Sequence, residues 1–533
     1  MINQIENQRV VKHKYVNTTP KVVVVGAGVG GLVSALLMAN AGAEVILLET
    51  HRESGGKMRQ LWPGSDPDVS NQEQVGIDSG PTVLTMKWVF EEIFNQVGAN
   101  LQSEINLTQL SVLARHAWSA DEGKHQLTLF SDHQQNIDSI SEFSGIAESR
   151  RFNEFCQTAK DLYKQLESAV IREANPSLKK MLFSLGPKGL TTLASIGPMK
   201  TLWESLGHFF TDARLRQLFA RYATYCGSSP WFAPATLMLI AQVEMDGVWS
   251  VEGGMRTLAK TLERMARERG VQFKYETTCK KIETHEGQVA AILTSHDERI
   301  SANAVFFNGD IQAVLNGDVG SQVQQALLKV NSNKSERSLS AVTWSMRCSI
   351  DDSQFKLDRH NVFFQNNYVN EFDDIFKRKR LPSTPTVYIC AQDRGLETTD
   401  QDKSTDEPLF CLVNAPAIGD VHEFSKQELD QCETQTFSLL DRCGLKIQRQ
   451  PEMTIQVQPK DFHQLFPSTG GALYGQATHG WMQVFSRSIA TTPVRGLFLT
   501  GGSVHPGPGV PMVAMSARLA AEAAMDHLGL TSR

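Results

Sequence analysis

Three glycines near the start of the chain, Gly26, Gly28 and Gly31, have the spacing G-x-G-x-x-G, and Glu49 follows eighteen residues after the last of them. The β-branched run at 22–25 predicts a buried strand before the glycines, and the apolar spacing after them predicts a helix. In such a unit Gly26 permits a tight turn, Gly28 lets the backbone approach a diphosphate, and Gly31 allows close packing of helix on strand. An acid at the end of the second strand can accept hydrogen bonds from an adenosine ribose. The chemistry predicted by these residues is dinucleotide binding.

Two further bare turns follow this unit. The chain reads GGK at 55–57, where two glycines precede a cation, and Gly80 and Pro81 lie in another loop of small residues. We expect Gly56, Lys57, Gly80 and Pro81 to contact the same cofactor. So many approaches favour FAD, which is long and stays bound, over a nicotinamide cofactor. The chain has no second G-x-G-x-x-G that would bind NAD(P)H.

A third bare loop lies close to the other end of the chain. The stretch GGSVHPGPGVPM at 501–512 holds four glycines and three prolines directly before a strongly helical segment. A loop with few side chains lets a ligand approach the backbone, and a helix N-terminus offers unpaired N–H groups and a partial positive charge. Pro511 suits the first helical turn, where its missing N–H is no loss. The pattern predicts a second element that faces the ligand.

Several stretches together resemble the flavin amine oxidase and phytoene desaturase superfamily. They are VVVVGAGVGGL at 22–32, the GGK turn, GVWSVEGGMRTLAKTLERMARERGVQF at 247–273 and the C-terminal loop. Four other stretches, among them RYATYCGSSPWFAPATLMLIAQVE at 221–244, resemble the bacterial 1-hydroxycarotenoid 3,4-desaturases within that superfamily. The resemblance covers most of residues 20–528.

This resemblance implies which residues hold FAD. Gly501 and Gly502 would pass the ribityl chain and the diphosphate, and Val510 to Met512 would open the last helix at the pyrimidine edge of the flavin. The helix N-terminus would then face the edge where negative charge gathers on reduction. The backbone of Cys279 would contact adenine. The C-terminal loop contains no cysteine, so we expect the FAD to be non-covalent.

The resemblance also implies the architecture. We expect an α/β fold in which a discontinuous, Rossmann-like FAD-binding domain carries an inserted α+β substrate domain. A chain of 533 residues exceeds one hydrophobic core, which agrees with two domains. The expected ranges are 1–19 for an N-terminal tail; 20–100, 246–312 and 488–533 for the FAD-binding domain; and 101–245 and 313–487 for the substrate domain.

Composition excludes several classes of protein. The net charge of −6 gives no basic footprint for nucleic acid, and the eight cysteines form no C-x-x-C pair that would favour zinc, so we expect neither nucleic acid nor metal. Scattered cysteines and the absence of a signal-peptide pattern favour a cytoplasmic protein.

Segment 181–210 is apolar and broken by Gly-Pro pairs; a buried core is the favoured interpretation, and a surface that dips into a bilayer is the alternative. Because a carotenoid is lipid-soluble, we expect peripheral association with the inner membrane.

Candidates for the proton acceptor near the flavin are His505 and His479, followed by Tyr474 and Arg115. A histidine in a Gly/Pro loop is more often a structural hydrogen-bonding group than a base, and the resemblance supports only the place of His505 near the flavin. Removal of a hydride and a proton from neighbouring carbons needs FAD for the difficult step and a protein that positions the substrate and excludes water.

The resemblance implies an FAD-dependent desaturase that introduces a C3–C4 double bond into an acyclic 1-hydroxy or 1-methoxy carotenoid. One alternative is a phytoene desaturase of several steps or another oxidoreductase of the flavin amine oxidase type, although the sequence alone locates no aromatic cage for an amine. An alternative of another class is a binding module similar to a prenyl-protein escort. The intact set of Gly26, Gly28, Gly31 and Glu49 argues against that module.

Overall fold

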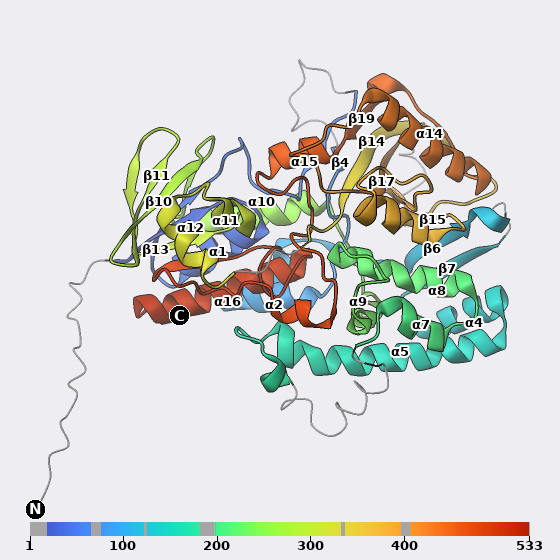
Figure 1. Ribbon diagram of the computed structural model, residues 1–533, viewed down its shortest axis with the longest axis horizontal. Helices are drawn as coiled ribbons and strands as arrows, with labels where there is room; N and C mark the ends of the chain where they lie inside the picture. Colours follow the sequence, from blue (N-terminus) through green and yellow to red (C-terminus); the bar gives the residue numbers. More distant parts are fainter. Residues whose placement is uncertain are drawn as a thin grey trace, which may run out of the picture.

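The computed structural model describes residues 19–64, 76–121, 125–181, 197, 199–331, 336–395 and 406–531. Figure 1 shows two parts side by side, one around a parallel sheet and one around a larger mixed sheet. Of the expected N-terminal tail, 1–18 lies outside the described residues. The expected α/β fold is confirmed, whereas the exact limits of the two domains stay a prediction.

The first sheet has five parallel strands that come from three distant segments of the chain. Its order is β20 (Leu497–Leu499), β13 (Ala304–Phe307), β1 (Lys21–Val25), β2 (Glu44–Leu48) and β9 (Gln272–Lys274). Val22, Val23 and Val24 are fully buried because helices or a second sheet cover both faces of β1. This placement explains the continuous β-branched run in the sequence.

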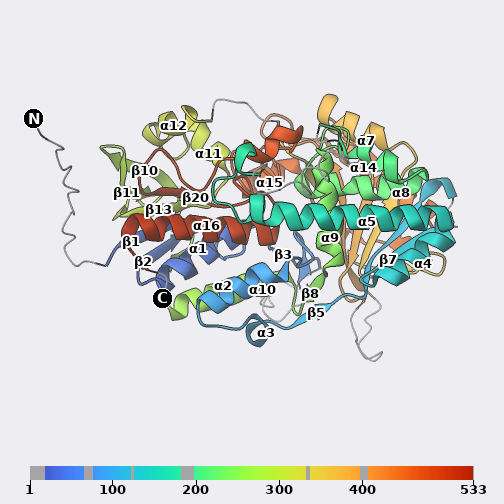
Figure 2. The ribbon, with the colours of Figure 1, turned by 90° about the horizontal axis from the view of Figure 1, so that it is seen from below.

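Four helices cover one face of the parallel sheet. They are α1 (Val29–Asn40), α2 (Lys87–Gln96), α10 (Met255–Glu268) and α16 (Val510–Leu528), and they share one hydrophobic cluster with β1. In Figures 1 and 2, α16, drawn in red from the C-terminal end, lies against α1 and α2, which come from the N-terminal end. The two ends of the chain therefore meet on this face.

A smaller antiparallel sheet covers the opposite face. It consists of β10 (Cys279–His285), β11 (Gln288–Thr294) and β12 (Arg299–Ser301), with α11 (Ile311–Asn316) and α12 (Ser321–Leu328) beside it. Glu286 and Gly287 form the turn that joins β10 to β11. The position of Cys279 at the start of β10 follows from this hairpin.

The mixed sheet forms the second part of the molecule. Its order is β18 (Lys446–Gln448), β14 (Ser340–Asp351), β17 (Glu407–Ala415), β16 (Val387–Ala391), β15 (His360–Phe364), β6 (Val112–Trp118) and β7 (Gln126–Phe130), and β19 (Thr454–Val457) also pairs with β14. Its pairs are antiparallel except for β15 with β6. Helix α14 (Lys426–Arg442) covers one face, where it begins with a capping box at Ser425.

Helices pack on the other face of the mixed sheet. They are α4 (His133–Ser144), α5 (Ile146–Leu166), α7 (Leu202–Phe209), α8 (Ala213–Ala220) and α9 (Leu239–Met245). In Figure 2 α5 and α16 lie end to end along the molecule. Of the apolar segment 181–210, residues 182–196 and 198 lie outside the described residues. Among the helices that the structure describes, none is long and apolar enough to cross a membrane.

Short elements complete the chain. The strands are β3 (Gln60–Leu61), β4 (Ile77–Asp78), β5 (Leu107–Gln109) and β8 (Trp249–Val251), and the helices are α3 (Leu101–Glu104), α13 (Tyr368–Phe372) and α15 (Pro459–Leu465). The remaining 3₁₀ and π turns are η1 (Ser119–Asp121), η2 (Glu167–Ile171), η3 (Arg221–Cys226), η4 (Ala235–Met238), η5 (Asp373–Lys377), η7 (Pro451–Met453) and η8 (Trp481–Phe485). Of these, η3 and η4 matter most, because they lie between the two parts.

Candidate active site

The first glycine-rich turn lies between β1 and α1. Gly26 has φ +96°, a conformation that side chains rarely adopt. A Cβ on Gly31 would lie 1.9 Å from the carbonyl oxygen of Gly26, so only glycine lets α1 pack so close to the turn. Gly28 is the N-cap of α1 and provides no side-chain cap. The first N–H groups of α1 therefore lack the capping that Ser425 gives to α14.

Glu49 lies directly after β2 and is 7 % exposed. One carboxylate oxygen accepts a hydrogen bond from the N–H of Ala27 at 2.6 Å, and the other accepts from the N–H of His51 at 2.9 Å. Each oxygen keeps a further lone pair that a ribose hydroxyl can use. The structure thus fixes the carboxylate beside the Gly26–Gly31 turn.

The second and third bare turns lie against the first. The N–H of Gly55 donates to the carbonyl of Ala27 at 2.9 Å, and a Cβ on Gly56 would lie 3.1 Å from the Cα of Gly28. A Cβ on Gly80 would lie 1.9 Å from the carbonyl oxygen of Lys57. The structure therefore brings the loops predicted to contact the cofactor into one continuous surface of backbone.

Lys57 itself is turned away from that surface. Its ammonium group donates to the carbonyl of Leu473 at 2.6 Å and lies over the ring of Phe466. Burial lowers the pKa of Lys57, and the nearby carboxylate of Asp310 opposes this effect. In this arrangement Lys57 ties the turn to the segment at 473, while direct contact with a cofactor stays a prediction.

Asn308 joins the two ends of the chain and was missed in the sequence. Its side-chain amide donates to the carbonyl of Gly26 at 3.3 Å, and its carbonyl oxygen accepts from the hydroxyl of Thr500 at 3.2 Å. A Cβ on Gly501 would lie 3.4 Å from that same oxygen, and one on Gly30 would lie 2.3 Å from it. Its place directly after the buried strand β13 was the available signal, since polar residues at carboxyl ends of parallel strands face the ligand.

The C-terminal loop leads into α16. Gly509, with φ +110°, is the N-cap and provides no side-chain cap, and Pro511 lies in the first turn as expected. Val510, Pro511 and Met512 line a large cavity among the described residues. Gly502 packs near Pro508, with ordinary contacts for an added Cβ. The start of α16 therefore directs its uncapped N–H groups toward that cavity.

These features fit FAD. The glycine turns pack so closely that a Cβ at Gly31 or Gly80 would clash with a backbone carbonyl, two uncapped helix starts offer N–H groups for anions, and Glu49 offers a carboxylate for a ribose. Glu49 would hold the adenosine ribose, the start of α1 the diphosphate, and the start of α16 the flavin. Cys279 lies near the ribose end, because the N–H of Thr277 donates to the carbonyl of Glu49 at 2.8 Å.

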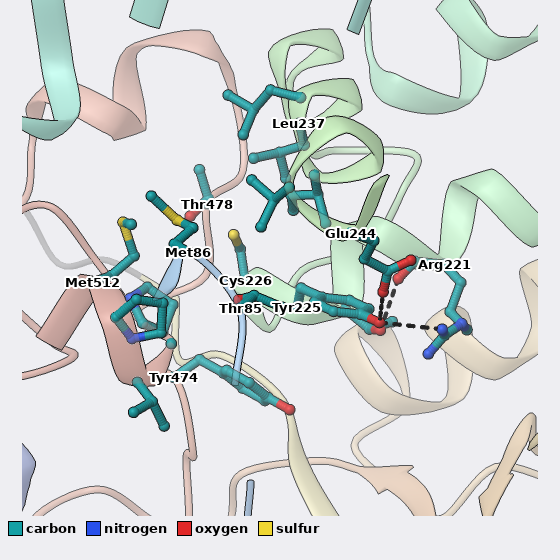
Figure 3. Close-up of a pocket in the computed structure, with 18 of the residues that line it drawn as sticks. Thr85, Met86, Arg221, Tyr225, Cys226, Leu237, Glu244, Tyr474, Thr478 and Met512 are labelled. Atoms are coloured by element: carbon teal, nitrogen blue, oxygen red, sulfur yellow. Dashed lines mark hydrogen bonds between the residues drawn. The ribbon is translucent and has the colours of Figure 1, made fainter. Parts of the chain in front are cut away.

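The cavity beyond α16 has a volume of about 670 Å³ and lies between the two parts of the molecule. Most of its wall is apolar and comes from α5, η2, η4, α9, the mixed sheet and the C-terminal loop. Figure 3 shows Met512 on one side and Arg221 with Glu244 on the other, with Tyr225 and Cys226 between them. Gly80 and Pro81 line the same cavity, so the cofactor cradle opens directly into it.

The two histidines predicted as proton acceptors do not line this cavity. His505 is 2 % exposed, and its Nε2 is 2.9 Å from the carbonyl of Glu173. Burial lowers the pKa of His505 to about 4. His479 accepts from the N–H of Ser229 through Nε2 and contacts the carboxylate of Glu336 through Nδ1. Both hydrogen-bond to neighbouring segments, which is a structural role, and neither stands on the wall where a substrate would meet the flavin.

Of the two lesser candidates, one lies on the wall. Tyr474 lines the cavity, whereas Arg115 does not and instead contacts the carbonyl of Lys356 and the carboxylate of Asp358. The expectation that no cysteine lies near the flavin considered only the C-terminal loop; Cys226 lines the cavity. Burial raises the pKa of the Cys226 thiol to about 11, which disfavours the reactive thiolate at neutral pH.

A chain of polar side chains on the wall was also missed. The hydroxyls of Thr82 and Tyr388 are 2.8 Å apart, and the Tyr388 hydroxyl is 2.8 Å from Nδ1 of His360. Nε2 of His360 is buried and has no hydrogen-bond partner among the described residues. Burial, with the charges of Arg359 and Arg221, lowers the pKa of His360 to about 3, so the ring is neutral. No sequence signal links these residues, which come from three different segments.

Comparison with known proteins agrees with this geometry. The family model for flavin-containing amine oxidoreductases matches residues 29–314. The chain is 49 % identical over 517 residues to a hydroxyneurosporene desaturase of Rubrivivax gelatinosus, which covers 97 % of this chain and 95 % of that protein. It is 26 % identical to a 1-hydroxycarotenoid 3,4-desaturase of a Flavobacterium species over 94 % of this chain and 98 % of that protein.

A solved structure shares the fold. Wild-type putrescine oxidase bound to putrescine superposes with a TM-score of 0.58 at 14 % identity, over 96 % of this chain and 99 % of that chain.

The chain belongs to the flavin-containing amine oxidoreductase family and, within it, to the hydroxyneurosporene desaturases. It is a flavin-dependent oxidoreductase, and its cofactor is FAD.

Proposed function

We propose that this protein is an FAD-dependent carotenoid desaturase that introduces a C3–C4 double bond into an acyclic 1-hydroxy or 1-methoxy carotenoid such as hydroxyneurosporene. The observation that carries the proposal is the apolar cavity that begins at Val510–Met512 and Gly80. A polyene chain has no hydrogen-bonding groups, so an apolar wall binds it through the hydrophobic effect. The names of the similar desaturases support the same substrate class.

The chemistry that FAD supplies when bound is two-electron oxidation of a carbon–carbon single bond. The protein has three tasks beside it. The apolar wall excludes water and holds the chain, and the uncapped N–H groups at the start of α16 stabilise negative charge at the end of the cavity where the flavin would lie. Polar groups such as the Tyr388–His360 pair line the cavity and could receive the proton of the substrate, whereas His505 and His479 do not line it.

The residues that line the cavity also bear on the alternative function, that of an amine oxidase. Tyr225, Tyr388 and Tyr474 do line the wall, so aromatic rings are available, contrary to the expectation from sequence that no cage could be located. An ammonium substrate would, however, meet the guanidinium of Arg221 on the same wall. The wall therefore favours an uncharged substrate.

We also propose that the protein works at the cytoplasmic surface of a membrane. Met199, Phe232 and Met482 are 79 %, 43 % and 46 % exposed. Met199 itself lines the cavity, and so do Trp481 and Phe485, which are close to Met482 in the sequence. Exposed apolar side chains therefore occur at the cavity or next to residues that line it. Vesicles should retain the protein in high salt and release it in mild detergent, because the contact would be apolar. Failure to bind carotenoid-containing liposomes would contradict this proposal.

Expression in a strain that accumulates hydroxyneurosporene tests the proposed reaction. Pigment analysis should show a product with one further conjugated double bond, and an unchanged pigment profile with FAD-loaded protein would contradict the reaction.

Denaturation by heat or acid tests the mode of cofactor binding. We expect it to release yellow FAD, because the thiol of Cys226 is protonated, whereas flavin that stays with the precipitate would show a covalent bond.

A further inference from the structure

One charged group of side chains interrupts the apolar wall. Arg221, Tyr225 and Glu244 all line the cavity, and they come from η3 and α9. The hydroxyl of Tyr225 donates to one oxygen of the Glu244 carboxylate and accepts from Nη2 of Arg221 at 3.3 Å. The hydroxyl of Tyr222 donates to the other carboxylate oxygen at 2.7 Å, but Tyr222 does not line the cavity. Figure 3 shows the dashed bonds that meet at Tyr225.

This group leaves hydrogen-bonding capacity on the cavity side. A guanidinium has five N–H donors, and within the described part of the chain only Nη2 of Arg221 has a hydrogen-bond partner. Its charge is linked to Glu244 through the Tyr225 hydroxyl, since the described residues contain no direct ion pair between them. Burial by itself would lower the pKa of Arg221, but the neighbouring tyrosines and Glu244 raise it, so the group stays cationic.

Charges on an apolar wall are costly. Removing two charged groups from water costs several kcal/mol per ion, and well-packed apolar side chains are often no less stable in their place. The apolar part of a carotenoid gains nothing from them. An uncompleted set of donors and acceptors on a binding wall is therefore explained best by a polar group of the ligand.

We propose that Arg221, Tyr225 and Glu244 form the subsite that binds the oxygen at C1 of the carotenoid. An N–H of Arg221 donates to this oxygen, and a hydroxyl proton at C1 is accepted by Glu244 or by the oxygen of Tyr225. This inference rests on the proposed function and adds the residues that select the oxygenated end.

The position of the subsite agrees with the reaction. Only C1 and C2 lie between the oxygen and C3. Because the oxygen is so close to the bond that is oxidised, it must be bound in the same cavity as the start of α16. Figure 3 shows Arg221 and Glu244 on the opposite side of the cavity from Met512, with the hydroxyl of Tyr225 turned toward them. A substrate that enters with its oxygenated end first would stop at this group with its C3–C4 bond inside the cavity.

Three ligands separate the two halves of the subsite. A 1-hydroxy end can accept from Arg221 and donate to Glu244, a 1-methoxy end can only accept, and a hydrocarbon end can do neither. A site that is built to hydrogen-bond a hydroxyl rejects an analogue without it, because its own polar groups stay unpaired.

The experiment compares kcat/KM for 1-hydroxyneurosporene, its 1-methoxy ether and 1,2-dihydroneurosporene, in the FAD-loaded wild type and three variants. We expect the wild type to prefer the hydroxyl over the hydrocarbon by roughly tenfold or more. Tyr225→Phe should lower this preference by about tenfold, because the loss of rate with the hydroxyl substrate should exceed any loss with the hydrocarbon. Glu244→Gln should act on the hydroxyl substrate more than on the methyl ether.

Tyr222→Phe is the matched control. It removes a tyrosine hydroxyl from the same carboxylate on the side away from the cavity, so it should keep the preference within about twofold. Absorbance of bound FAD reports that each variant is folded, and the tyrosine pair is sufficient if Glu244→Gln fails to fold.

The outcomes are distinct. Equal wild-type rates with all three ligands would overturn the subsite and leave the desaturase function intact. Equal losses in Tyr222→Phe and Tyr225→Phe with every ligand would also overturn it, because they would show a structural effect. No turnover of any of the three by FAD-loaded wild type would overturn both the function and the subsite.

Discussion

The cofactor cradle and the cavity beside it differ in the kind of atoms that form them. The cradle consists of backbone: Gly31 and Gly80 are so close to neighbouring carbonyl oxygens that a Cβ has no room, and the helix starts at α1 and α16 are uncapped. The cavity wall consists of side chains from many segments, with a charged group at one place. In the proposed arrangement the backbone would bind the diphosphate that every FAD shares and Glu49 would bind the ribose, whereas side chains of the cavity would select one substrate among many. The two regions should therefore respond differently to mutation.

The largest effect is expected in the cradle. Gly31→Ala would place a methyl group 1.9 Å from the carbonyl oxygen of Gly26, so α1 must move away from β1. We expect purified protein without bound FAD, measured by absorbance near 450 nm. Ser34→Ala on the same helix is the control, because its buried hydroxyl has no partner among the described residues and its loss leaves the packing unchanged. Full FAD content in Gly31→Ala would show that the cradle tolerates side chains.

The next effect concerns Glu49, the side chain expected to bind the ribose. Glu49→Arg should abolish FAD retention, because a cation cannot accept from ribose hydroxyls and adds bulk beside the turn. Glu44→Arg makes the same charge change at the exposed start of β2, where Glu44 pairs with Lys21, and should retain FAD. If both variants purify with full flavin, Glu49 does not hold the ribose.

Where the cradle meets the cavity, we expect an effect on rate. Gly509 has φ +110°, and the nearest atom to an added Cβ is 3.9 Å away, so a side chain there is strained and projects beside the start of α16. Gly509→Leu should slow flavin reduction by substrate by roughly a hundredfold, about 3 kcal/mol of barrier. His505→Asn and His479→Asn should slow it much less, since neither histidine lines the cavity. Anaerobic stopped-flow measurements compare the rate of flavin reduction in the three variants. A larger loss in a histidine variant than in Gly509→Leu would show that this histidine is the base.

The smallest effect is a pH dependence of stability that comes from Glu371, a buried carboxyl group behind the cavity wall, whose partners Thr386 and Asn414 line the cavity. Burial raises the pKa of Glu371 to about 7, although Thr386 and Asn414 donate hydrogen bonds to it. The unfolded chain releases this proton near pH 4.3, so stability falls as pH rises from about 4.3 to 7 and stays lower above that range, by at most about 4 kcal/mol.

Glu371→Gln should remove this fall, so the variant gains stability relative to wild type between pH 5 and pH 8. Denaturant midpoints at both pH values measure it, with the exposed Glu452→Gln as the control. The buried carboxyl of Asp78, whose pKa is raised to about 6, contributes equally to all three proteins and cancels. An identical pH profile in wild type and Glu371→Gln would contradict the assignment.

The same contrast explains what the sequence could predict. The turn at Gly26–Gly31, Glu49 and the loop before α16 are local patterns with fixed spacing, and they were found together with the α/β fold. Asn308, Arg221 and His360 act through segments that only the fold brings together, so no spacing indicates them. The two histidines were chosen as possible bases near the expected flavin face, but the structure gives them hydrogen-bond partners outside the cavity.

The most direct test of the account is a single anaerobic turnover. FAD-loaded protein mixed with 1-hydroxyneurosporene in detergent should lose its flavin absorbance near 450 nm while the carotenoid spectrum shifts to longer wavelength, in equal molar amounts. A flavin that stays oxidised in the presence of saturating 1-hydroxyneurosporene, with the pigment spectrum unchanged, would contradict the central claim that the cradle and the cavity together form a carotenoid desaturase.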